Sequence, residues 1–309
     1  MSITALGYLG ISSPRHGDWR EFGTAFLGAE LVEDGPDGAV RLRVDDVQWR
    51  VQIHPGDEDR VQYIGWLAHS EDDLPVIVDK LAAAGVEASW GSPELARDRN
   101  VKQLITFTDP WGFAHEVAWG QRRRAASFRP GRPISGFVTG AQGLGHIVLL
   151  LPDVDEGHKF FSGVLGFEMS DIVIDPLVGD PVHGFYGRFY HVNARHHTLA
   201  IGNCPPGMAG LHHLMLQVGT IDDMGSAHDL LDKFDVPELL GIGQHTNDEM
   251  VSFYLTTPSQ FHIEYGYAGL EVEKDHTPTL FGRASKWGHK FNPEARNRPA
   301  GLMHKLPTN

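Results

Sequence analysis

Cysteine is almost absent from this chain of 309 residues, because Cys204 is the only one. A single cysteine excludes an internal disulfide and is typical of a reducing compartment, so we expect a cytoplasmic protein. Long apolar runs are lacking too. The longest, Ile147 to Leu151, is far shorter than the roughly 20 residues that span a bilayer, so we expect no membrane partner. The chain also opens without the basic and apolar segments of a secretory signal.

Positive charge is scarce: 26 Lys and Arg stand against 40 Asp and Glu, for a formal net charge of −14. The densest basic cluster, Arg122-Arg123-Arg124, is assigned to a solvated linker. We therefore expect no nucleic-acid partner. With 41% hydrophobic and 21% charged residues, the composition is that of a globular protein, and the length suffices for two domains.

The chain contains an internal repeat. Leu27-Gly28-Ala29-Glu30 reappears as Leu165-Gly166-Phe167-Glu168, and Asp109 to Glu116 reappears as Thr257 to Glu264. A shorter acidic match lies between these blocks, in the same order in both halves. Matched blocks in one order indicate two copies of one module.

Within each copy, the hydrophobic periodicity predicts two βαβββ units, and hence an α+β fold rather than a doubly wound one. Helices are expected over residues 18–27, 76–84, 153–165 and 224–234. The segment 121–142 is rich in Arg, Gly and Pro and is interpreted as the linker. This places the N-terminal module at residues 1–135 and the C-terminal catalytic module at residues 136–309. The proline-rich tail, 271–309, is expected to wrap the surface, with Trp287-Gly288-His289 as an anchor.

The two copies differ at positions that matter chemically. Two positions are Tyr in the first copy and His in the second, and a third is Glu in both: Tyr8 and His146, Tyr63 and His213, Glu116 and Glu264. Two His and one carboxylate on one side of a metal, with the other side open, form the ligand set of non-haem Fe(II) oxygenases. We therefore predict a metal site in the second copy and its loss from the first.

One stretch of the second copy carries a recognisable motif. It reads Gly-x-His, a short gap, apolar-Tyr, then Pro and Glu, with His245, Tyr254 and Glu264 as its polar members. Val251 to Leu255 and Phe261 to Tyr265 are predicted to form a β-hairpin. The motif resembles the signature of the type I extradiol ring-cleavage dioxygenases of the vicinal oxygen chelate superfamily.

The resemblance covers nearly the whole chain and includes Gly145-His146, Arg195 to Ala200 and His212 to Leu216. It departs at Gln260, where the family usually has Gly or Pro. Within the family, the chain most resembles the two-domain members that act on bicyclic or larger catechols.

The resemblance implies extradiol cleavage of a bicyclic or bulky-substituted catechol, such as 2,3-dihydroxybiphenyl, by O2 in aromatic compound catabolism. It implies that His146, His213 and Glu264 bind Fe(II), with Mn(II) as the alternative metal. His213 is preferred over His212, because the family ligand directly precedes the apolar-Met-Leu run. The resemblance also implies a homo-oligomer and no organic cofactor.

Further roles follow from the same resemblance. His197 resembles the acid–base histidine, and His196 is the alternative, because adjacent strand residues face opposite sides. His245 and Tyr254 resemble the residues that hydrogen-bond the substrate oxygens.

The surroundings of these residues are predicted from their places in the sequence. Asn247 and Asp248 are candidates to orient His245, and Asp248 is equally suited to a turn. Val148, Phe189 and the Phe185-Tyr186 region are candidates for an apolar substrate pocket.

Two other functions fit the same fold. One is a metal-dependent isomerase or lyase of the glyoxalase type, and the other is a non-catalytic binding protein of the bleomycin-resistance type. A ring-opening assay with a catechol separates both from the dioxygenase.

Overall fold

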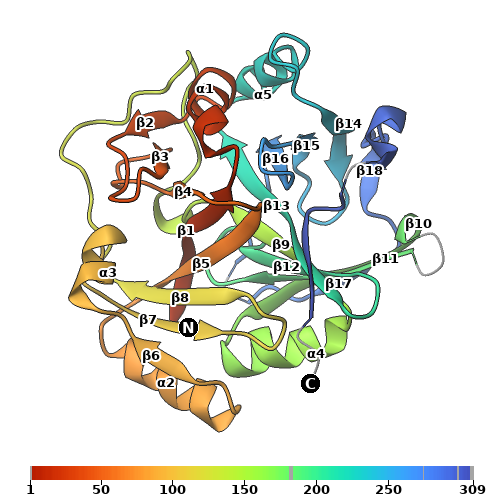
Figure 1. The fold of residues 1–309 in the computed structure, drawn as a ribbon. Coiled ribbons are helices and arrows are strands. Elements are labelled where there is room, and N and C mark those ends of the chain that lie inside the picture. The colour runs from red at the N-terminus through yellow and green to blue at the C-terminus, as the bar shows by residue number, and fades with distance from the viewer. Residues whose placement is uncertain (1, 181–183, 274, 298, 307–309) are drawn as a thin grey trace. The chain divides into compact units, whose positions relative to one another are not determined.

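The computed structural model describes residues 2–180, 184–273, 275–297 and 299–306 (Figure 1). Its backbone divides into two compact units. The first runs up to Leu144 and includes Val164–Gly166, and the second consists of Gly145–Gly163 and the residues from Phe167 onward. The arginine-rich segment expected as the linker therefore lies within the first unit.

The first unit contains an eight-stranded sheet in the order β2-β3-β4-β1-β5-β8-β7-β6. The strands are β1 (Ile3–Ser13), β2 (Glu30–Val32), β3 (Val40–Arg43), β4 (Val51–Pro55), β5 (Arg60–Ala68), β6 (Ala88–Trp90), β7 (Gln103–Thr108) and β8 (Ala114–Trp119). Its helices are η1 (His16–Asp18), α1 (Trp19–Glu21), the π-helix η2 (Phe22–Phe26), α2 (Asp73–Ala83) and α3 (Pro93–Asp98). Strand β4 runs parallel to β1, and β8 runs parallel to β5. Strands β1 and β5 are antiparallel to each other, and the two βαβββ units meet at this pair.

The second unit contains an eleven-stranded sheet in the order β17-β10-β11-β12-β9-β13-β16-β15-β14-β18, with β19 paired to β13. Its strands are β9 (His146–Leu151), β10 (Glu168–Asp180), β11 (Gly184–His191), β12 (Leu199–Asn203), β13 (Met208–Val218), β14 (Glu238–His245), β15 (Val251–Thr256), β16 (His262–Tyr267), β17 (Thr279–Phe281), β18 (Ser285–Trp287) and β19 (Leu302–Lys305). Its helices are α4 (Val154–His158), the π-helix η4 (Lys159–Val164), α5 (Ile221–His228) and the 3₁₀-helix η5 (Pro293–Asn297). A further 3₁₀-helix, η3 (Gly140–Gln142), belongs to the first unit.

Strands β9 to β16 repeat the order of β1 to β8, which confirms the α+β class with two copies of a paired βαβββ module. The register agrees as well. Tyr8 pairs with Gly65, which pairs with Glu116, and His146 pairs with Met215, which pairs with Glu264. The tyrosines and histidines compared from the sequence therefore occupy equivalent places.

Three of the four predicted helices agree with the structure to within a few residues, α3 was not predicted, and α5 differs. This helix starts at Ile221 and ends at His228, whereas the pattern predicted residues 224–234. Thr220 caps the start, since its hydroxyl accepts the N–H of Asp223. The chain then passes through turns to Asp235, whose φ of 50° is outside the helical range.

The tail was expected to wrap the surface, but it extends the second sheet instead. Strand β17 pairs with β10, β18 with β14 and β19 with β13. The backbone N–H and C=O groups of each short strand form hydrogen bonds with an existing strand. Such a strand needs no hydrophobic periodicity of its own, and for that reason the sequence pattern did not predict it.

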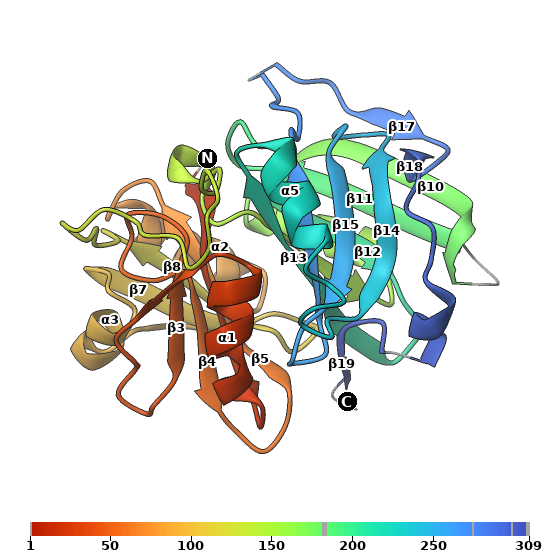
Figure 2. The same cartoon turned by 90° about the horizontal axis from the view of Figure 1, so that it is seen from above.

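Both sides of the central strand β9 are buried. Along β9, His146, Val148 and Leu150 line a cavity. Leu151 faces the other way, toward Gly157 of α4. Helix α5 packs beside β13 and β16 on its side of the sheet (Figure 2). The cavity face is therefore free to hold polar groups.

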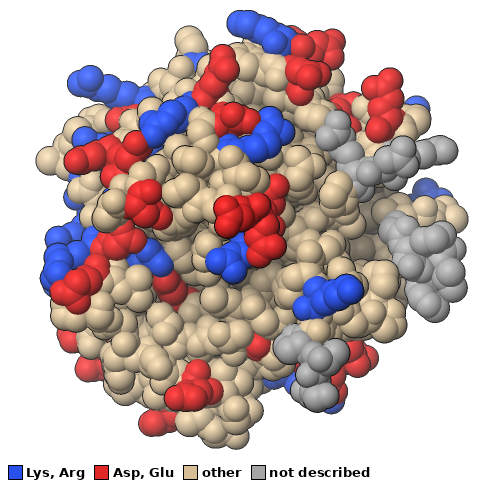
Figure 3. Space-filling model, viewed as in Figure 1, with Lys and Arg blue, Asp and Glu red and all other residues tan. Residues whose placement is uncertain are grey.

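The surface is mixed in charge. On the face in view, blue Lys and Arg side chains are scattered among red Asp and Glu (Figure 3). No helix among the described residues is long and apolar enough to cross a bilayer.

Candidate metal centre

Three neighbouring strands of the second unit bring His146, His213 and Glu264 together. The strands β9, β13 and β16 lie side by side in the sheet. His213 pairs with Val148, which lies two residues after His146 on the cavity-facing side of β9. Glu264 pairs with Met215, two residues after His213 on β13. All three side chains are buried, with exposures of 1% for His146, 5% for His213 and 1% for Glu264.

The ligand atoms of these residues converge. The Nε2 atoms of His146 and His213 lie 3.2 Å apart, and they lie 3.1 and 3.4 Å from Oε2 of Glu264. Bonds of about 2.1 Å at right angles to one ion would place ligand atoms about 3.0 Å apart. The spacing of this buried cluster therefore fits a divalent metal.

The protonation of the cluster also suits a metal. Burial lowers the pKa of His146 to about 3, so its imidazole is neutral, the form that binds a metal. Burial alone would raise the pKa of Glu264. Hydrogen bonds from His146, His213 and His245 outweigh this and hold that pKa well below its usual value. On the far side of His213, its Nδ1 lies 2.7 Å from Nδ1 of His212, so Nε2 is the nitrogen turned toward the cluster.

His245 and Tyr254 lie beside the cluster, as the motif predicted. Nε2 of His245 is 2.7 Å from the Tyr254 hydroxyl and 3.2 Å from Oε1 of Glu264. Its Nδ1 donates to the carbonyl of Ala284 at 3.0 Å, which fixes the ring. Both side chains line the cavity, so they can reach a ligand bound there.

His197 and His196 face opposite ways, as alternation requires. The His197 ring lies 3.8 Å from that of His146, centroid to centroid, with the edge of Phe189 against it at 4.9 Å. The His196 ring turns away to Asp171, at 2.7 Å between Nε2 and Oδ2. Of the pair, His197 lines the cavity.

Asn247 and Asp248 also line the cavity, but neither is hydrogen-bonded to His245. Oδ1 of Asp248 accepts the N–H of Met250 at 3.0 Å, so Asp248 is a turn residue, and the expected orienting role belongs to Ala284. Nδ2 of Asn247 is buried and has no hydrogen-bond partner among the described residues.

The cavity beside the cluster has a volume of about 530 Å³. Its walls include Val148, Phe185 and Phe189, as expected from the sequence. Tyr186 lies elsewhere, with its hydroxyl against Asp155 at 3.1 Å. Apolar side chains from β14 and the tail add to the lining: Leu239, Leu240, Phe291 and Met303. This volume is within the range of small-molecule sites.

Two polar residues of the site were missed from the sequence. The Ser252 hydroxyl donates to Oε1 of Glu264 at 2.6 Å, and Nε2 of His289 lies 3.2 Å from that hydroxyl. The His289 ring also lies 4.2 Å from the ring of His245. Ser252 could have been found, because strand alternation puts it on the same face as Tyr254. His289 had only the anchor motif of the tail as a signal.

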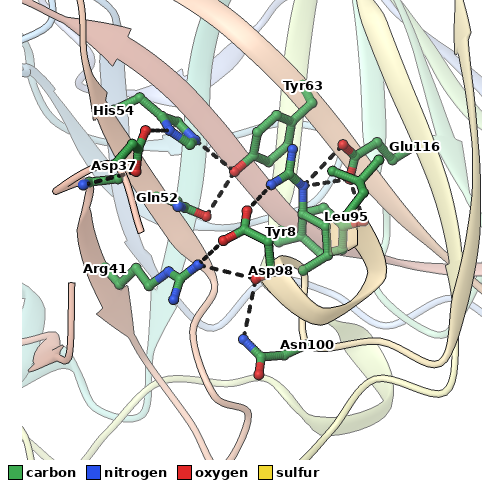
Figure 4. A network of polar contacts seen from close by, with 12 residues as sticks. Tyr8, Asp37, Arg41, Gln52, His54, Tyr63, Leu95, Asp98, Asn100 and Glu116 are labelled. Carbon is green, nitrogen blue, oxygen red and sulfur yellow. Dashed lines mark hydrogen bonds and ion pairs between the residues drawn. The ribbon is translucent and has the colours of Figure 1, made fainter. Parts of the chain in front are cut away.

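The equivalent place in the first unit is filled by protein. The Tyr8 hydroxyl donates to Oε2 of Glu116 at 2.7 Å, and Nε of Arg99 donates to both oxygens at 3.0 and 2.9 Å. The Arg99 guanidinium lies 3.6 Å from the centre of the Tyr63 ring. Asp98 contacts both Arg41 and Arg99 in the same network (Figure 4). An arginine thus neutralises the carboxylate.

Comparison with known proteins gives two family matches. The family described as "Dihydroxybiphenyl dioxygenase BphC D1" matches residues 6–56, and the "Glyoxalase/Bleomycin resistance protein/Dioxygenase superfamily" matches residues 143–265.

Relatives resemble the chain over almost its full length. It is 41% identical to biphenyl-2,3-diol 1,2-dioxygenase of Paraburkholderia xenovorans, over 94% of this chain and 96% of the relative. It is 38% identical to an iron-dependent extradiol dioxygenase of Rhodococcus jostii, over 94% and 98%. The crystal structure of BphC, a halotolerant catechol dioxygenase, is 42% identical with a TM-score of 0.93, over 98% of this chain and 99% of that one.

Proposed function

The chain belongs to the extradiol catechol dioxygenases of the glyoxalase and dioxygenase superfamily, and we propose that it cleaves 2,3-dihydroxybiphenyl or a catechol of similar bulk. The bond broken lies beside the diol, and both oxygen atoms of O2 enter the product. One observation carries the proposal: a buried His-His-Glu cluster opens onto a largely apolar cavity in the second unit.

We propose that His146, His213 and Glu264 hold Fe(II). Two imidazoles and one carboxylate are the ligand types of non-haem Fe(II) enzymes, and they also accept Mn(II). A relative of this chain is named as iron-dependent. When bound, the metal supplies Lewis-acid chemistry that lowers the pKa of a phenol, and it provides a path for electrons from catechol to O2.

The chain's own residues then place the substrate. His245 and Tyr254 lie next to Glu264 and are suited to hydrogen-bond one catechol oxygen each or to share one. Nδ2 of Asn247 has a donor to offer a ligand in the cavity. Val148 and Phe189 pack against an aromatic ring and exclude water from it.

His197 is proposed as the acid–base group. It lies against His146 and lines the cavity, so it can take a proton released as the substrate reacts and return it to the product. Phe189 holds the ring from one side, which limits its rotation.

The decisive experiment is a ring-opening assay. Metal-free protein is loaded with Fe(II) or, separately, Mn(II), and is mixed with 2,3-dihydroxybiphenyl in air. We expect a yellow ring-opened product with O2 consumed in equal amount, and a colourless anaerobic control. A panel of catechols of increasing bulk then defines the substrate. Absence of turnover with every catechol and both metals would overturn the proposal.

We also propose a cytoplasmic homo-oligomer. The lone Cys204 suits a reducing compartment. Exposed apolar side chains along β10 and β17, including Leu177 and Leu280 at 86% and 63% exposure, support association with another copy. Light scattering on the purified protein tests this, and a monomer at micromolar concentration would contradict it.

A further inference from the structure

A buried hydrogen-bonded chain runs behind His197. The N–H of Thr279, on the tail strand β17, donates to Oδ1 of Asp171 at 2.7 Å. Oδ2 of Asp171 lies 2.7 Å from Nε2 of His196, and Nδ1 of His196 lies 3.1 Å from Nδ1 of His197. Asp171, His196 and His197 are all buried, with exposures of 2%, 3% and 4%.

The order of partners determines where the protons are. An ionised carboxylate only accepts hydrogen bonds, so His196 must donate to Asp171 from Nε2. With its single ring proton on Nε2, His196 offers a lone pair at Nδ1, which accepts the Nδ1–H of His197. His197 is left with its lone pair on Nε2, and its side chain lines the cavity.

We propose that Asp171 and His196 are positioning residues that hold His197 in the Nδ1–H tautomer, so that its Nε2 lone pair can accept a proton in the site. The inference rests on the proposed function for its catalytic meaning, but not for the tautomer itself. The proton taken at Nε2 is later returned from Nε2, while the Nδ1 proton stays shared with His196. Proton and charge therefore balance within one turnover.

Other groups near His197 do not replace this chain. Oδ2 of Asp248 is 3.9 Å from Nδ1 of His197, which is beyond hydrogen-bond distance. The rings of His146 and Phe189 lie against that of His197, with centroids 3.8 and 4.9 Å away, so they fix its plane but not its tautomer. The His276 ring lies near that of His196, with the centroids 6.2 Å apart. Its Nε2 donates to the carbonyl of Ser170 at 2.9 Å, so this nitrogen is not turned to His197.

Asp171→Asn should invert the chain. The Thr279 N–H still needs an acceptor, so the amide oxygen of the new side chain takes that side and its NH2 faces His196. His196 must then accept at Nε2 and carry its proton on Nδ1, where it donates to Nδ1 of His197. The His197 proton moves to Nε2, the nitrogen that should be free to accept.

The test is ¹⁵N NMR of the imidazoles in metal-free protein labelled at histidine, because protonated and unprotonated nitrogens have well-separated shifts. The His197 signals are assigned by their loss in His197→Gln. In the wild type we expect His197 protonated at Nδ1, and in Asp171→Asn at Nε2. A wild-type His197 protonated at Nε2 would overturn the proposal even if the variant did not fold.

Turnover gives the second readout. With Fe(II) bound, Asp171→Asn should lower kcat by about 10- to 100-fold, the usual cost of losing such a partner, with KM nearly unchanged. The matched control is His191→Gln, which removes another buried imidazole, hydrogen-bonded to Ser170, from the same layer. Equal kcat losses in both variants, or none in either, would overturn the proposal. An inactive wild type would count against the proposed function alone, because the tautomer is measured without metal or substrate.

Discussion

The two modules treat the same buried carboxylate in different ways. In the first, Glu116 accepts from Tyr8 and forms an ion pair with Arg99, so its charge is neutralised by a side chain of the chain itself. In the second, Glu264 is contacted by His146, His213, His245 and the Ser252 hydroxyl.

The difference shows how duplication separates stability from function. A carboxylate paired with arginine already has its charge neutralised, so it does not bind a metal ion. A carboxylate contacted by imidazoles and a hydroxyl, with no arginine beside it, can still bind an added divalent cation. The second module therefore leaves its carboxylate accessible to an ion.

The largest expected effect is the loss of activity in Glu264→Gln. Removing the carboxylate charge should abolish metal binding and lower kcat/KM by more than about 100-fold, the upper range for losing only a partner of a ligand. Turnover of 2,3-dihydroxybiphenyl and metal content per chain measure it. The equivalent change in the first module, Glu116→Gln, should leave both within about threefold. A comparable loss of metal in both variants would erase the distinction between the modules.

The next effect concerns the free energy of unfolding, for which the change in the first module should be the more damaging one. Glu116→Gln leaves the buried Arg99 without its main partner, and breaking such a pair costs about 3–5 kcal/mol of unfolding free energy. Glu264→Gln in metal-free protein should cost less, because His245 can release its proton when it loses this carboxylate, whereas Arg99 stays charged. Urea denaturation of both metal-free variants decides between them. A larger loss in Glu264→Gln would contradict this account.

A smaller effect comes from the metal itself. Fe(II) or Mn(II) at about 100 times its dissociation constant should stabilise the wild type by about 2.7 kcal/mol. Thermal unfolding under anaerobic conditions shows this as a rise in Tm. His213→Ala should show no rise, and a rise of equal size there would place the metal elsewhere.

The smallest effect separates the two hairpin turns. Gln260 has a φ of 63° at the place where the first module has Gly112, with a φ of 90°. Both turns have the same hydrogen bond, from Gln260 N–H to Thr257 and from Gly112 N–H to Asp109. Gln260→Gly should therefore stabilise the protein by about 0.5–1 kcal/mol, and Gly112→Gln should destabilise it by a similar amount. Denaturation midpoints that move the other way would contradict this.

Much of this site could be predicted from the sequence because the repeat provides an internal control. The block at residues 27–30 and its copy at residues 165–168 gave the offset that places Tyr8 opposite His146, and this difference was visible without any relative. The hairpin of β15 and β16 followed from ordinary strand patterning.

The remainder depends on contacts that no local pattern encodes. Arg99 was not foreseen as the cation of the first module, because α3 brings it to Glu116 from a separate part of the chain. Thr279 and His289 reach the site from the tail, whose short strands rely on neighbouring strands rather than on periodicity. Such long-range pairings become visible only in the folded chain.

Metal stoichiometry tests the central claim most directly. Elemental analysis of anaerobically loaded wild type should give one Fe(II) or Mn(II) per chain. His146→Ala and His213→Ala should bind none, and Tyr8→Phe should still bind one. Two ions per chain, or one ion retained in either histidine variant, would contradict the assignment of a single site to the second module.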